Sequence, residues 1–422
     1  MSGPGVSGDP GTDRELAVRF ELTSPPAGFI DNPYPVYGAL RAHAPVRVLE
    51  SGAVFLSRYD DVAAVYRLSQ ASSDKRLEFA PKFGQSPLFE HHTSSLVFND
   101  PPAHTRVRRL MMGAVNQRAI QRMEAGLRAL VGRLLEAMAE KAAGGEAIDL
   151  IADYAAAIPV EVIGNLLAIP HAERGPLRDW SLAILSALEP APSGEVLARG
   201  NEAVTDFCDA LRILVADRRK APLDPEEDVL TRLILGAPQG ERLDERELLH
   251  NCIFLLNAGH ETTTNLIGNG VDALLRWPEQ MTRLRREPAT VPSAIEEMLR
   301  YESPLQLNNR VLNAPAVLGG QEFPAGTFVT LGVGAANHDA AQFPEPERFD
   351  VARRPNRHLA FGHGDHACLG MNVARLEGRI AIAALLERFG RIERAAEPVR
   401  DRRVRFRGFS ALPVSLVQVS SH

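Results

Sequence analysis

Residues 361–370 read FGHGDHACLG, and the amphipathic helical pattern MNVARLEGRIAIAALLERF follows them directly. This glycine-rich loop therefore carries Cys368 to the start of a helix, where free backbone N–H groups and the helix dipole favour an anion and lower the pKa of a thiol. The glycines leave room for a flat group close to the backbone. A thiolate held in this way is a soft ligand suited to iron. The alternative is a buried, unreactive cysteine, but the combined spacing of Phe, Gly and Cys makes chance a poor explanation.

A second informative stretch runs from Asp244 to Pro278 and predicts one long helix. Asp244 and Glu247 form a capping-box pattern at its start, and Pro278 ends it. Its middle, AGHETTTN, places Gly259, Glu261 and three threonines in an otherwise apolar helix, where Gly and Thr are unfavourable. Close packing at Gly259 and hydroxyl bonds to the preceding turn would explain these residues structurally. Taken alone, the segment leaves a structural and a chemical explanation open.

The remaining sequence predicts a mostly α protein with a minor β portion. Helical periodicity dominates residues 103–235 and is clear over 118–143. Residues 46–62 are typical of a short hairpin that leads into another helix, and further β-like stretches cluster late, at 316–334 and 404–419. No interdomain linker interrupts the pattern, so we expect one large domain over residues 26–422. The Gly-, Pro- and Ser-rich start predicts a disordered segment over residues 1–25.

Composition excludes several classes of protein. The 422 residues contain three cysteines, with no C-x-x-C spacing, which excludes a disulfide framework and a zinc ribbon. This cysteine usage fits a reducing, cytoplasmic environment. The formal charge of −6 gives no indication of nucleic-acid binding. The sequence contains no uncharged apolar run long enough for membrane insertion.

The loop around Cys368 resembles the cysteine-ligand loop of bacterial cytochromes P450, F-G-x-G-x-H-x-C-x-G, at every fixed position. The resemblance implies a single-domain cytochrome P450 fold that binds haem b (iron protoporphyrin IX). It also implies that Cys368 is the axial ligand of the haem iron and that Phe361 packs beside it. His366 would then bond a haem propionate.

The A-G-x-E-T stretch at residues 258–262 is similar to the oxygen-binding segment of the same family. The resemblance places Ala258 and Gly259 against the haem face, where they leave room for O2. Thr262 would hold a hydroxyl and a water molecule near the bound O2, and Glu261 would link this place to solvent protons. Monooxygenation consumes protons, which an acid–alcohol pair can deliver.

A further resemblance concerns a folding role. Glu297 and Arg300 are spaced i,i+3 on one predicted helix, and a P-E-R-F segment follows at residues 346–349. An E-x-x-R pair is most often a solvated surface pair. In cytochromes P450, however, it pairs with an arginine of the later segment. The resemblance therefore gives Glu297, Arg300 and Arg348 a structural role.

Propionate anchors are implied at three positions. His104 and Arg108 lie four residues apart on a predicted helix, so they face the same way and could hold one propionate. Arg310 would hold the other. Arg106 and Arg109 lie on other faces of that helix, and we interpret them as residues that could meet an acidic redox partner.

The resemblance implies a monooxygenase that inserts one O2-derived oxygen atom into an apolar or partly apolar small molecule. Nothing in the sequence resembles a flavin or iron–sulfur reductase domain, so we expect electrons from an external ferredoxin and an NAD(P)H-dependent ferredoxin reductase. The alternatives within the fold are a peroxygenase, an oxidative-coupling enzyme and a nitric-oxide reductase. A haem-binding sensor without turnover is a third class, which the acid–alcohol pair disfavours.

Substrate contacts are expected, by analogy, from a loop at residues 82–96 and from segments 254–258, 305–307 and around 406. Core packing is nearly as good an explanation for each of these side chains. The candidates are Phe83, Phe89, Phe254, Leu305 and Phe406, with Asn257 and Gln306 as polar contacts.

Overall fold

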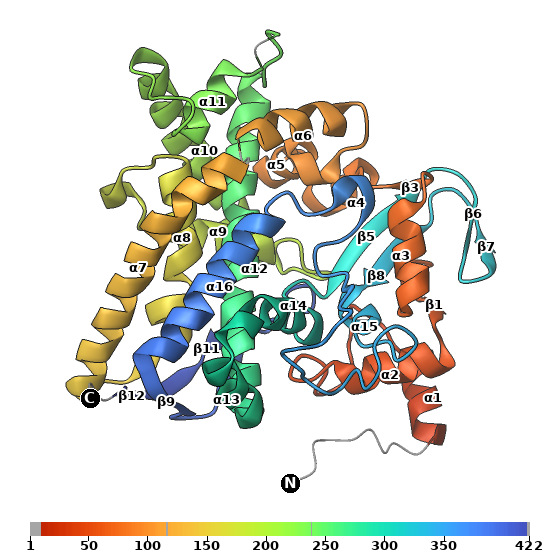
Figure 1. Cartoon of the computed structure of the whole chain (residues 1–422). Helices are drawn as coiled ribbons and strands as arrows, with labels where there is room; N and C mark the ends of the chain where they lie inside the picture. Colours follow the sequence, from red (N-terminus) through yellow and green to blue (C-terminus); the bar gives the residue numbers. More distant parts are fainter. Residues whose placement is uncertain (1–9, 115–116, 238, 420–422) are drawn as a thin grey trace.

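The computed structural model describes residues 10–114, 117–237 and 239–419. Helix α12 (Glu245–Arg276) runs through the middle of the molecule, between a helical part and a part that contains the larger sheet (Figure 1). The capping box predicted for its start is present, because Asp244 and Glu247 each accept the other's backbone N–H. The predicted long helix is therefore confirmed, and α13 (Pro278–Arg286) begins at the proline that follows it.

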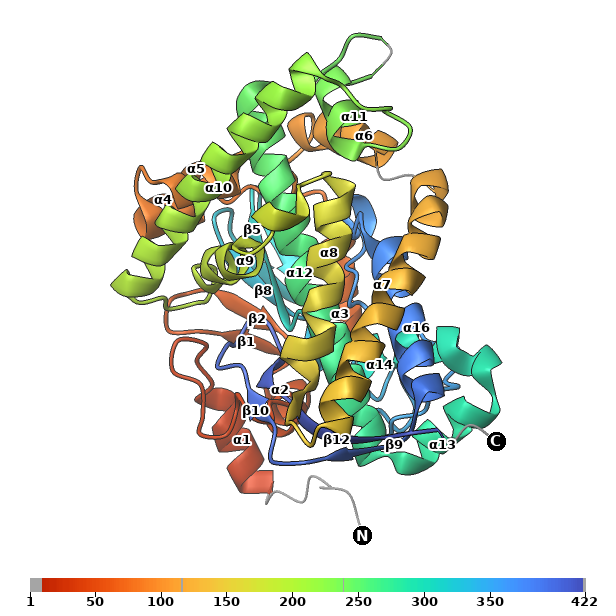
Figure 2. The same cartoon turned by 90° about the vertical axis from the view of Figure 1, so that its left-hand side faces the viewer.

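Several helices surround α12 in the helical part of the molecule, most of them in direct contact with it and α7 mainly through α8 and α16 (Figure 2). Apolar residues at helical spacing give these helices one buried face each. They are α7 (Gln117–Ala143), α8 (Ala157–Leu166), α9 (Leu177–Ser186), α10 (Gly194–Lys220), α14 (Val291–Tyr301) and α16 (Met371–Arg388). Shorter helices complete the structure: α2 (Tyr34–His43), α3 (Tyr59–Arg67), α4 (Arg76–Phe83), α5 (Pro87–Ser94), α6 (Ala103–Ala114), α11 (Val229–Leu235) and α15 (Val333–Ala336).

The larger sheet has five strands in the order β1-β2-β8-β5-β3. Strands β1 (Val46–Val48) and β2 (Val54–Leu56) form an antiparallel hairpin, and β2 pairs in parallel with β8 (Phe328–Gly332). Strand β5 (Leu307–Leu312) pairs antiparallel with β8 and with β3 (Ala71–Ser72). Beside this sheet, β6 (Ala316–Leu318) and β7 (Gln321–Phe323) form a separate hairpin.

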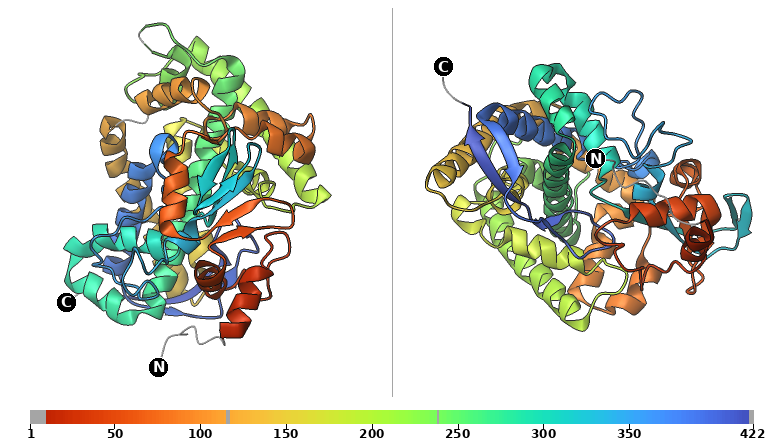
Figure 3. Two further views of the ribbon diagram at one scale, coloured as in Figure 1. Left: turned by 90° about the vertical axis from the view of Figure 1, so that its right-hand side faces the viewer. Right: turned by 90° about the horizontal axis from the view of Figure 1, so that it is seen from below.

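Two small sheets are built mainly from the C-terminal part of the chain, and they cross one end of the helical part (Figure 3). Strand β12 (Pro413–Gln418) lies between β4 (Ile148–Asp149) and β9 (Phe389–Arg394). Strands β10 (Val399–Arg400) and β11 (Phe409–Ala411) form the other pair. The segment between them, residues 401–408, is called the C-terminal loop below. Its Phe406 bridges to Leu305, so the loop reaches the interior beside α12.

The N-terminal segment differs from its prediction. Residues 1–9 of the predicted disordered segment lie outside the described residues, but α1 (Pro10–Val18) and the chain that follows it are packed against the fold. Phe20 is fully buried and its ring meets that of Phe55 edge-on at 5.3 Å. Aromatic burial against a distant strand outweighs the local polar composition. Residues 82–96, expected to be a loop, form the end of α4 and all of α5.

The described segments 10–114, 117–237 and 239–419 contain no helix that is both long and apolar enough to cross a bilayer.

Candidate active site

The loop that carries Cys368 has a shape that its sequence requires. The Cys368 N–H donates to the Phe361 carbonyl at 2.9 Å, which closes the loop on itself. Gly364 has φ +72°, and a Cβ there would lie 2.6 Å from the Tyr66 carbonyl oxygen. Only glycine fits both conditions. The loop therefore holds the cysteine at a defined place just before α16.

Cys368 as a whole residue is partly exposed, but its sulfur is largely removed from water, and the pKa of the thiol differs from the expectation. Burial raises this pKa and outweighs the lowering by the Gly370 N–H and by the positive charges of Arg108 and Arg375. The prediction of a lowered pKa considered only the helix terminus. The sulfur is also removed from water, which disfavours its charged form. A cation bound to the sulfur would reverse this balance.

The middle of α12 has one face that other side chains do not cover. Ala258 is exposed and Thr262 is partly exposed, although most residues around them on this central helix are buried. Gly259 is also partly exposed, but it packs closely on α8, because a Cβ there would lie 3.0 Å from Ile163 Cδ1. The Thr262 hydroxyl donates to the Ala258 carbonyl at 2.7 Å. Exposure at the centre of a large domain indicates an internal hollow, so the structure leaves space for a bound group along this face.

Glu261 points to a different neighbour from Thr262. It is buried, accepts from Asn265 Nδ2 at 2.8 Å, and forms an ion pair with Arg403 of the C-terminal loop. The sequence does not indicate Arg403, which is separated from Glu261 by 142 positions. No local signal marks it among the many arginines of the C-terminal segment.

Four cationic or potentially cationic side chains gather beside the Cys368 loop. His104 is buried, neither of its ring nitrogens has a hydrogen-bond partner, and its ring stacks on that of His366 at 3.8 Å. Arg108 donates to the Ala367 carbonyl at 2.8 Å. The pKa of His366 is lowered to about 3, first by burial and then by His104, Arg310 and Arg108. The structure therefore brings the predicted propionate anchors together.

These anchors fit a group that carries carboxylates. Buried polar atoms without partners are uncommon in folded proteins and call for an unseen partner. Both His104 ring nitrogens are such atoms, and the neighbouring positive charges favour an anion. Arg310 is buried, with Nη1 at 2.8 Å from its own neighbour's carbonyl, that of Asn309. The donor set matches haem propionates, and the exposed face of α12 matches the flat ring.

Arg106 and Arg109 each have an acidic partner within the chain, and their contact with a redox partner stays a prediction. Arg106 forms an ion pair with Glu247, and Arg109 forms one with Glu241. Both guanidinium groups are therefore bound within the chain, because acidic residues around the start of α12 face α6.

The predicted folding cluster is present, but the arginine that joins it is Arg353 and not the predicted Arg348. Arg300 and Glu297 are fully buried and form two hydrogen bonds of 2.8 and 2.9 Å. The arginine that joins them is Arg353, whose Nε lies 3.1 Å from Glu297 Oε1. Arg348 contributes only its carbonyl oxygen, because its side chain is 54% exposed and pairs with Glu345. The chain turns after residue 348, and this turn brings Arg353 back to the carboxylate.

Most of the candidate substrate contacts share one apolar cluster. Phe83 and Phe406 are buried in it, and Phe89, Phe254 and Leu305 pack against it. Asn257 is also buried, and its Nδ2 lies 3.5 Å from His91 Nε2, a neighbour that the sequence analysis did not single out. Gln306 lies elsewhere.

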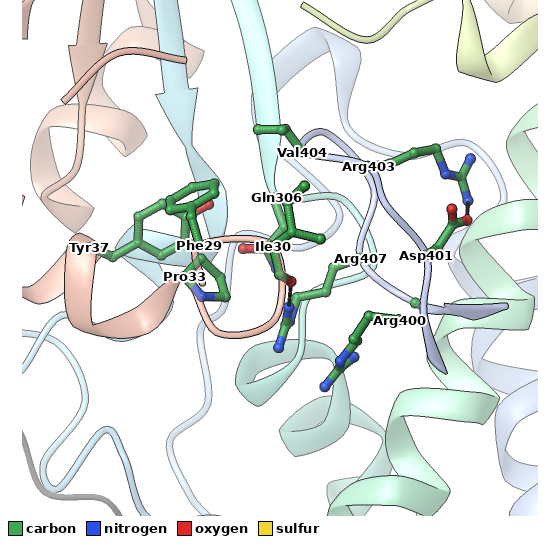
Figure 4. Close-up of a pocket in the computed structure, with 11 residues that line it drawn as sticks. Phe29, Ile30, Pro33, Tyr37, Gln306, Arg400, Asp401, Arg403, Val404 and Arg407 are labelled. Carbon is green, nitrogen blue, oxygen red and sulfur yellow. Dashed lines mark hydrogen bonds and ion pairs between the residues drawn. The ribbon is translucent and has the colours of Figure 1, made fainter. Parts of the chain in front are cut away.

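Gln306 donates to the Ser303 carbonyl at 2.7 Å and lines a small pocket under the C-terminal loop (Figure 4). The structure therefore separates Gln306 from the other six candidates, because its side chain turns toward the N-terminal part of the fold.

Known proteins are similar to this chain in both sequence and fold. The family described as "Cytochrome P450" matches residues 188–406. Cytochrome P450 107B1 of Saccharopolyspora erythraea is 38% identical, over 85% of this chain and 88% of the relative. The chain belongs to the cytochrome P450 family. The vitamin D(3) 25-hydroxylase of Pseudonocardia autotrophica is 35% identical to this P450, over 92% of this chain and 94% of the relative.

A solved structure confirms the predicted fold. P450BioI, crystallised in complex with hexadec-9Z-enoic acid ligated acyl carrier protein, superposes with a TM-score of 0.86. It is 33% identical, and the match covers 92% of this P450 and all (100%) of that chain. Family membership makes the protein a monooxygenase of the oxidoreductase class with a haem cofactor.

Proposed function

We propose that this P450 inserts one atom of O2 into an apolar or partly apolar small molecule, at a haem b bound through Cys368. Electrons come from an external ferredoxin and its NAD(P)H-dependent reductase. The observation that carries the proposal is the uncovered face of α12 at Ala258 and Thr262, with buried Glu261 next to it. A non-catalytic haem protein has no need of this acid–alcohol pair.

The residues that hold the haem follow from the site. Cys368 supplies the axial thiolate, with Phe361 in the same loop. His104 and Arg108 would bind one propionate and Arg310 the other, and His366 would bond one of the two. When bound, the haem supplies the iron that binds O2 and the redox chemistry that activates it.

Thr262 and Glu261 provide protons in this proposal. The Thr262 hydroxyl faces the hollow and keeps its oxygen lone pairs free to hold a water molecule there, while its hydrogen is donated to the Ala258 carbonyl. Glu261, one position earlier, gives a proton to that water and regains one from outside. The carboxylate is buried, so its proton supply depends on its own neighbours.

Thr262→Ala is expected to divert reducing equivalents into hydrogen peroxide and to lower the product formed per NAD(P)H by about tenfold. The reason is that water in the hollow loses its hydroxyl partner. Product and peroxide are measured together, with Thr262→Ser as the control that keeps the hydroxyl. An unchanged ratio of product to consumed NAD(P)H (the coupling) in Thr262→Ala contradicts the assigned role.

The substrate is expected to be apolar with one or two polar groups. The cluster that contains Phe83, Phe254 and Phe406 offers an apolar wall, and the buried Asn257 offers a polar contact. The names of the relatives support this class, because a vitamin D(3) hydroxylase and a P450 bound to a fatty-acyl carrier protein both act on or hold long apolar molecules. Terpenoids, aromatics and polyketides fit the same description.

The ferredoxin is expected to dock on the Cys368 side of the protein. A cavity of about 210 Å³ lies there, lined in part by Asn372, Arg375 and Arg379 of α16. The Arg375 guanidinium also lies over the Phe361 ring at 4.7 Å, beside the cysteine loop. Arg375 pairs there with Glu296 at 2.8 Å, and Arg379 adds a second positive charge, so the lining is basic on balance and suits an acidic electron carrier.

The ferric protein, titrated with terpenoids, aromatics, fatty acids and macrolides, is expected to show a blue-shifted Soret band with the scaffold it accepts. The shift reports displacement of water from the iron and so identifies the haem and the substrate class together. An unchanged band places the substrate outside the panel. No Soret band after haem reconstitution overturns the proposed function, and turnover driven better by peroxide than by reduced ferredoxin overturns the proposed electron donor.

A further inference from the structure

A small pocket lies between the C-terminal loop and the segment around α2 (Figure 4). Its volume of about 10 Å³ is enough for about one water molecule. Arg403, Asp401 and Gly408 of the C-terminal loop line it, together with Gln306. Gln306 Oε1 is buried there without a hydrogen-bond partner. Phe29, Ile30 and Val404 also line the pocket, so its wall is partly apolar. The pocket is therefore small, and the unpaired Gln306 oxygen gives a water molecule a polar partner there.

Arg403 connects this pocket to the buried acid. Its side chain is 7% exposed, and its Nη2 is shared between Glu261 and Asp401. Its other two nitrogens, Nε and Nη1, are buried without a partner. Asp401 is 29% exposed, so the three groups lead from the interior toward solvent. Figure 4 shows Arg403 and Asp401 turned toward each other.

The other arginines of the pocket are bound elsewhere. Arg407 donates to Glu302 at 2.6 Å and to the Ile30 carbonyl at 3.0 Å. Arg400 donates to Asn269 Oδ1 at 3.1 Å. Their contacts hold the N-terminal segment and α12 in place, whereas Arg403 is the lining arginine that pairs with Glu261.

The charges around Glu261 leave Arg403 as its counter-charge. His260, the preceding residue, has its pKa lowered to about 3 by burial and by Arg178 and Arg403, so it is neutral near neutral pH. Asp179 acts weakly in the opposite sense. Asn265, which donates to Glu261, is uncharged. A Cβ at Gly408 would collide with Asn265, so this glycine lets the loop approach α12 here.

We propose that Arg403 is the positioning residue for Glu261 and that water enters the proton path through this pocket. The proposal rests on the proposed function of Glu261. A water on the free Arg403 N–H groups passes a proton to the Glu261 carboxylate when the guanidinium shifts toward Asp401. Glu261 then gives a proton toward Thr262. One proton enters for each proton that leaves, and no electron moves.

Arg403→Met is expected to slow product formation about tenfold and to raise the peroxide share, because Glu261 loses its orientation. The matched control is Arg402→Met, which changes an exposed arginine of the same loop. The solvent deuterium isotope effect should increase in Arg403→Met only, because proton transfer becomes slower. In Arg403→Ala, millimolar guanidinium chloride should restore the product formed per NAD(P)H by occupying the enlarged pocket. In Arg403→Lys this ratio should lie between those of the wild type and Arg403→Met.

A second measurement needs no turnover. Arg403→Met leaves a buried carboxylate without its counter-charge, so its melting temperature should fall by roughly 5 °C, and Glu261→Gln in the same chain should recover most of that loss. The amount of product formed per NAD(P)H should be the same in the double variant as in Glu261→Gln alone.

These results separate the two proposals. Additive losses of stability, or full coupling in Arg403→Met, overturn the positioning role while the monooxygenase proposal stands. A wild-type protein that binds haem but shows no coupled turnover overturns the monooxygenase proposal, and the stability cycle then still decides whether the ion pair exists.

Discussion

Glu297→Ala is expected to lower the free energy of unfolding by about 3–5 kcal/mol. The carboxylate is fully buried and accepts hydrogen bonds from Arg300 and Arg353, so its removal leaves two buried cations without a counter-charge. Domains of ordinary stability have only about 5–15 kcal/mol in total, so the loss is a large share of it. Urea denaturation of the purified protein, with the midpoint and the slope both measured, gives the value.

The control distinguishes the arginine seen in the structure from the one that the sequence indicated. Arg353→Met is expected to destabilise the protein strongly, because its guanidinium is 10% exposed and meets Glu297. Arg348→Met is expected to cost less than about 1 kcal/mol, because its exposed pair with Glu345 is a surface salt bridge. Equal losses for both variants would show that the cluster is held by the segment as a whole and not by Arg353.

Local signals were enough for the main elements of the fold. The capping box at Asp244 and the proline at 278 delimit α12 because each acts within one or two helical turns. The hairpin of β1 and β2 at residues 46–62 and the helix α7 at 118–143 could likewise be predicted from short stretches of sequence. The cysteine loop could be predicted too, because its glycines and Cys368 lie within ten residues and their spacing carries the geometry.

Long-range contacts explain what the sequence did not show. Phe20 packs against Phe55, and no residue near Phe20 in the sequence indicates that contact. Arg353, and not Arg348, pairs with Glu297, because the chain turns between them and only Arg353 points inward. Arg403 meets Glu261 only through the C-terminal loop. Each of these errors concerns a partner chosen by tertiary packing, which helix or strand periodicity does not encode.

The Cys368 sulfur shows how burial changes a conclusion drawn from secondary structure. The helix terminus supplies the Gly370 N–H, as expected, yet burial raises the thiol pKa overall. A metal ion bound to this sulfur would lower the pKa of the thiol and so stabilise the thiolate, which the protein alone does not do. The protein's own contribution is the position of the sulfur, fixed by the Cys368 hydrogen bond to Phe361 and by Gly364.

Cys368→Ala is therefore expected to abolish O2-dependent product formation and the thiolate signature of the haem. Alanine removes the axial sulfur and with it the electron donation that activates O2 in this family. The ferrous carbon monoxide complex measures this directly, because its Soret band moves to shorter wavelength when the thiolate is lost. Haem can still be held by the propionate anchors His104, Arg108 and Arg310, so loss of the signature is separable from loss of the cofactor.

The other two cysteines provide the matched controls for this prediction. Cys208 and Cys252 are buried, and burial raises their pKa values to about 11 and about 12, so neither is a thiolate at neutral pH. Cys208→Ala and Cys252→Ala should keep the carbon monoxide band of the wild type and lose at most some stability, because each leaves only a small cavity. A Cys368→Ala protein that keeps the thiolate band means that another residue binds the iron, and the assignment of the axial ligand is then wrong.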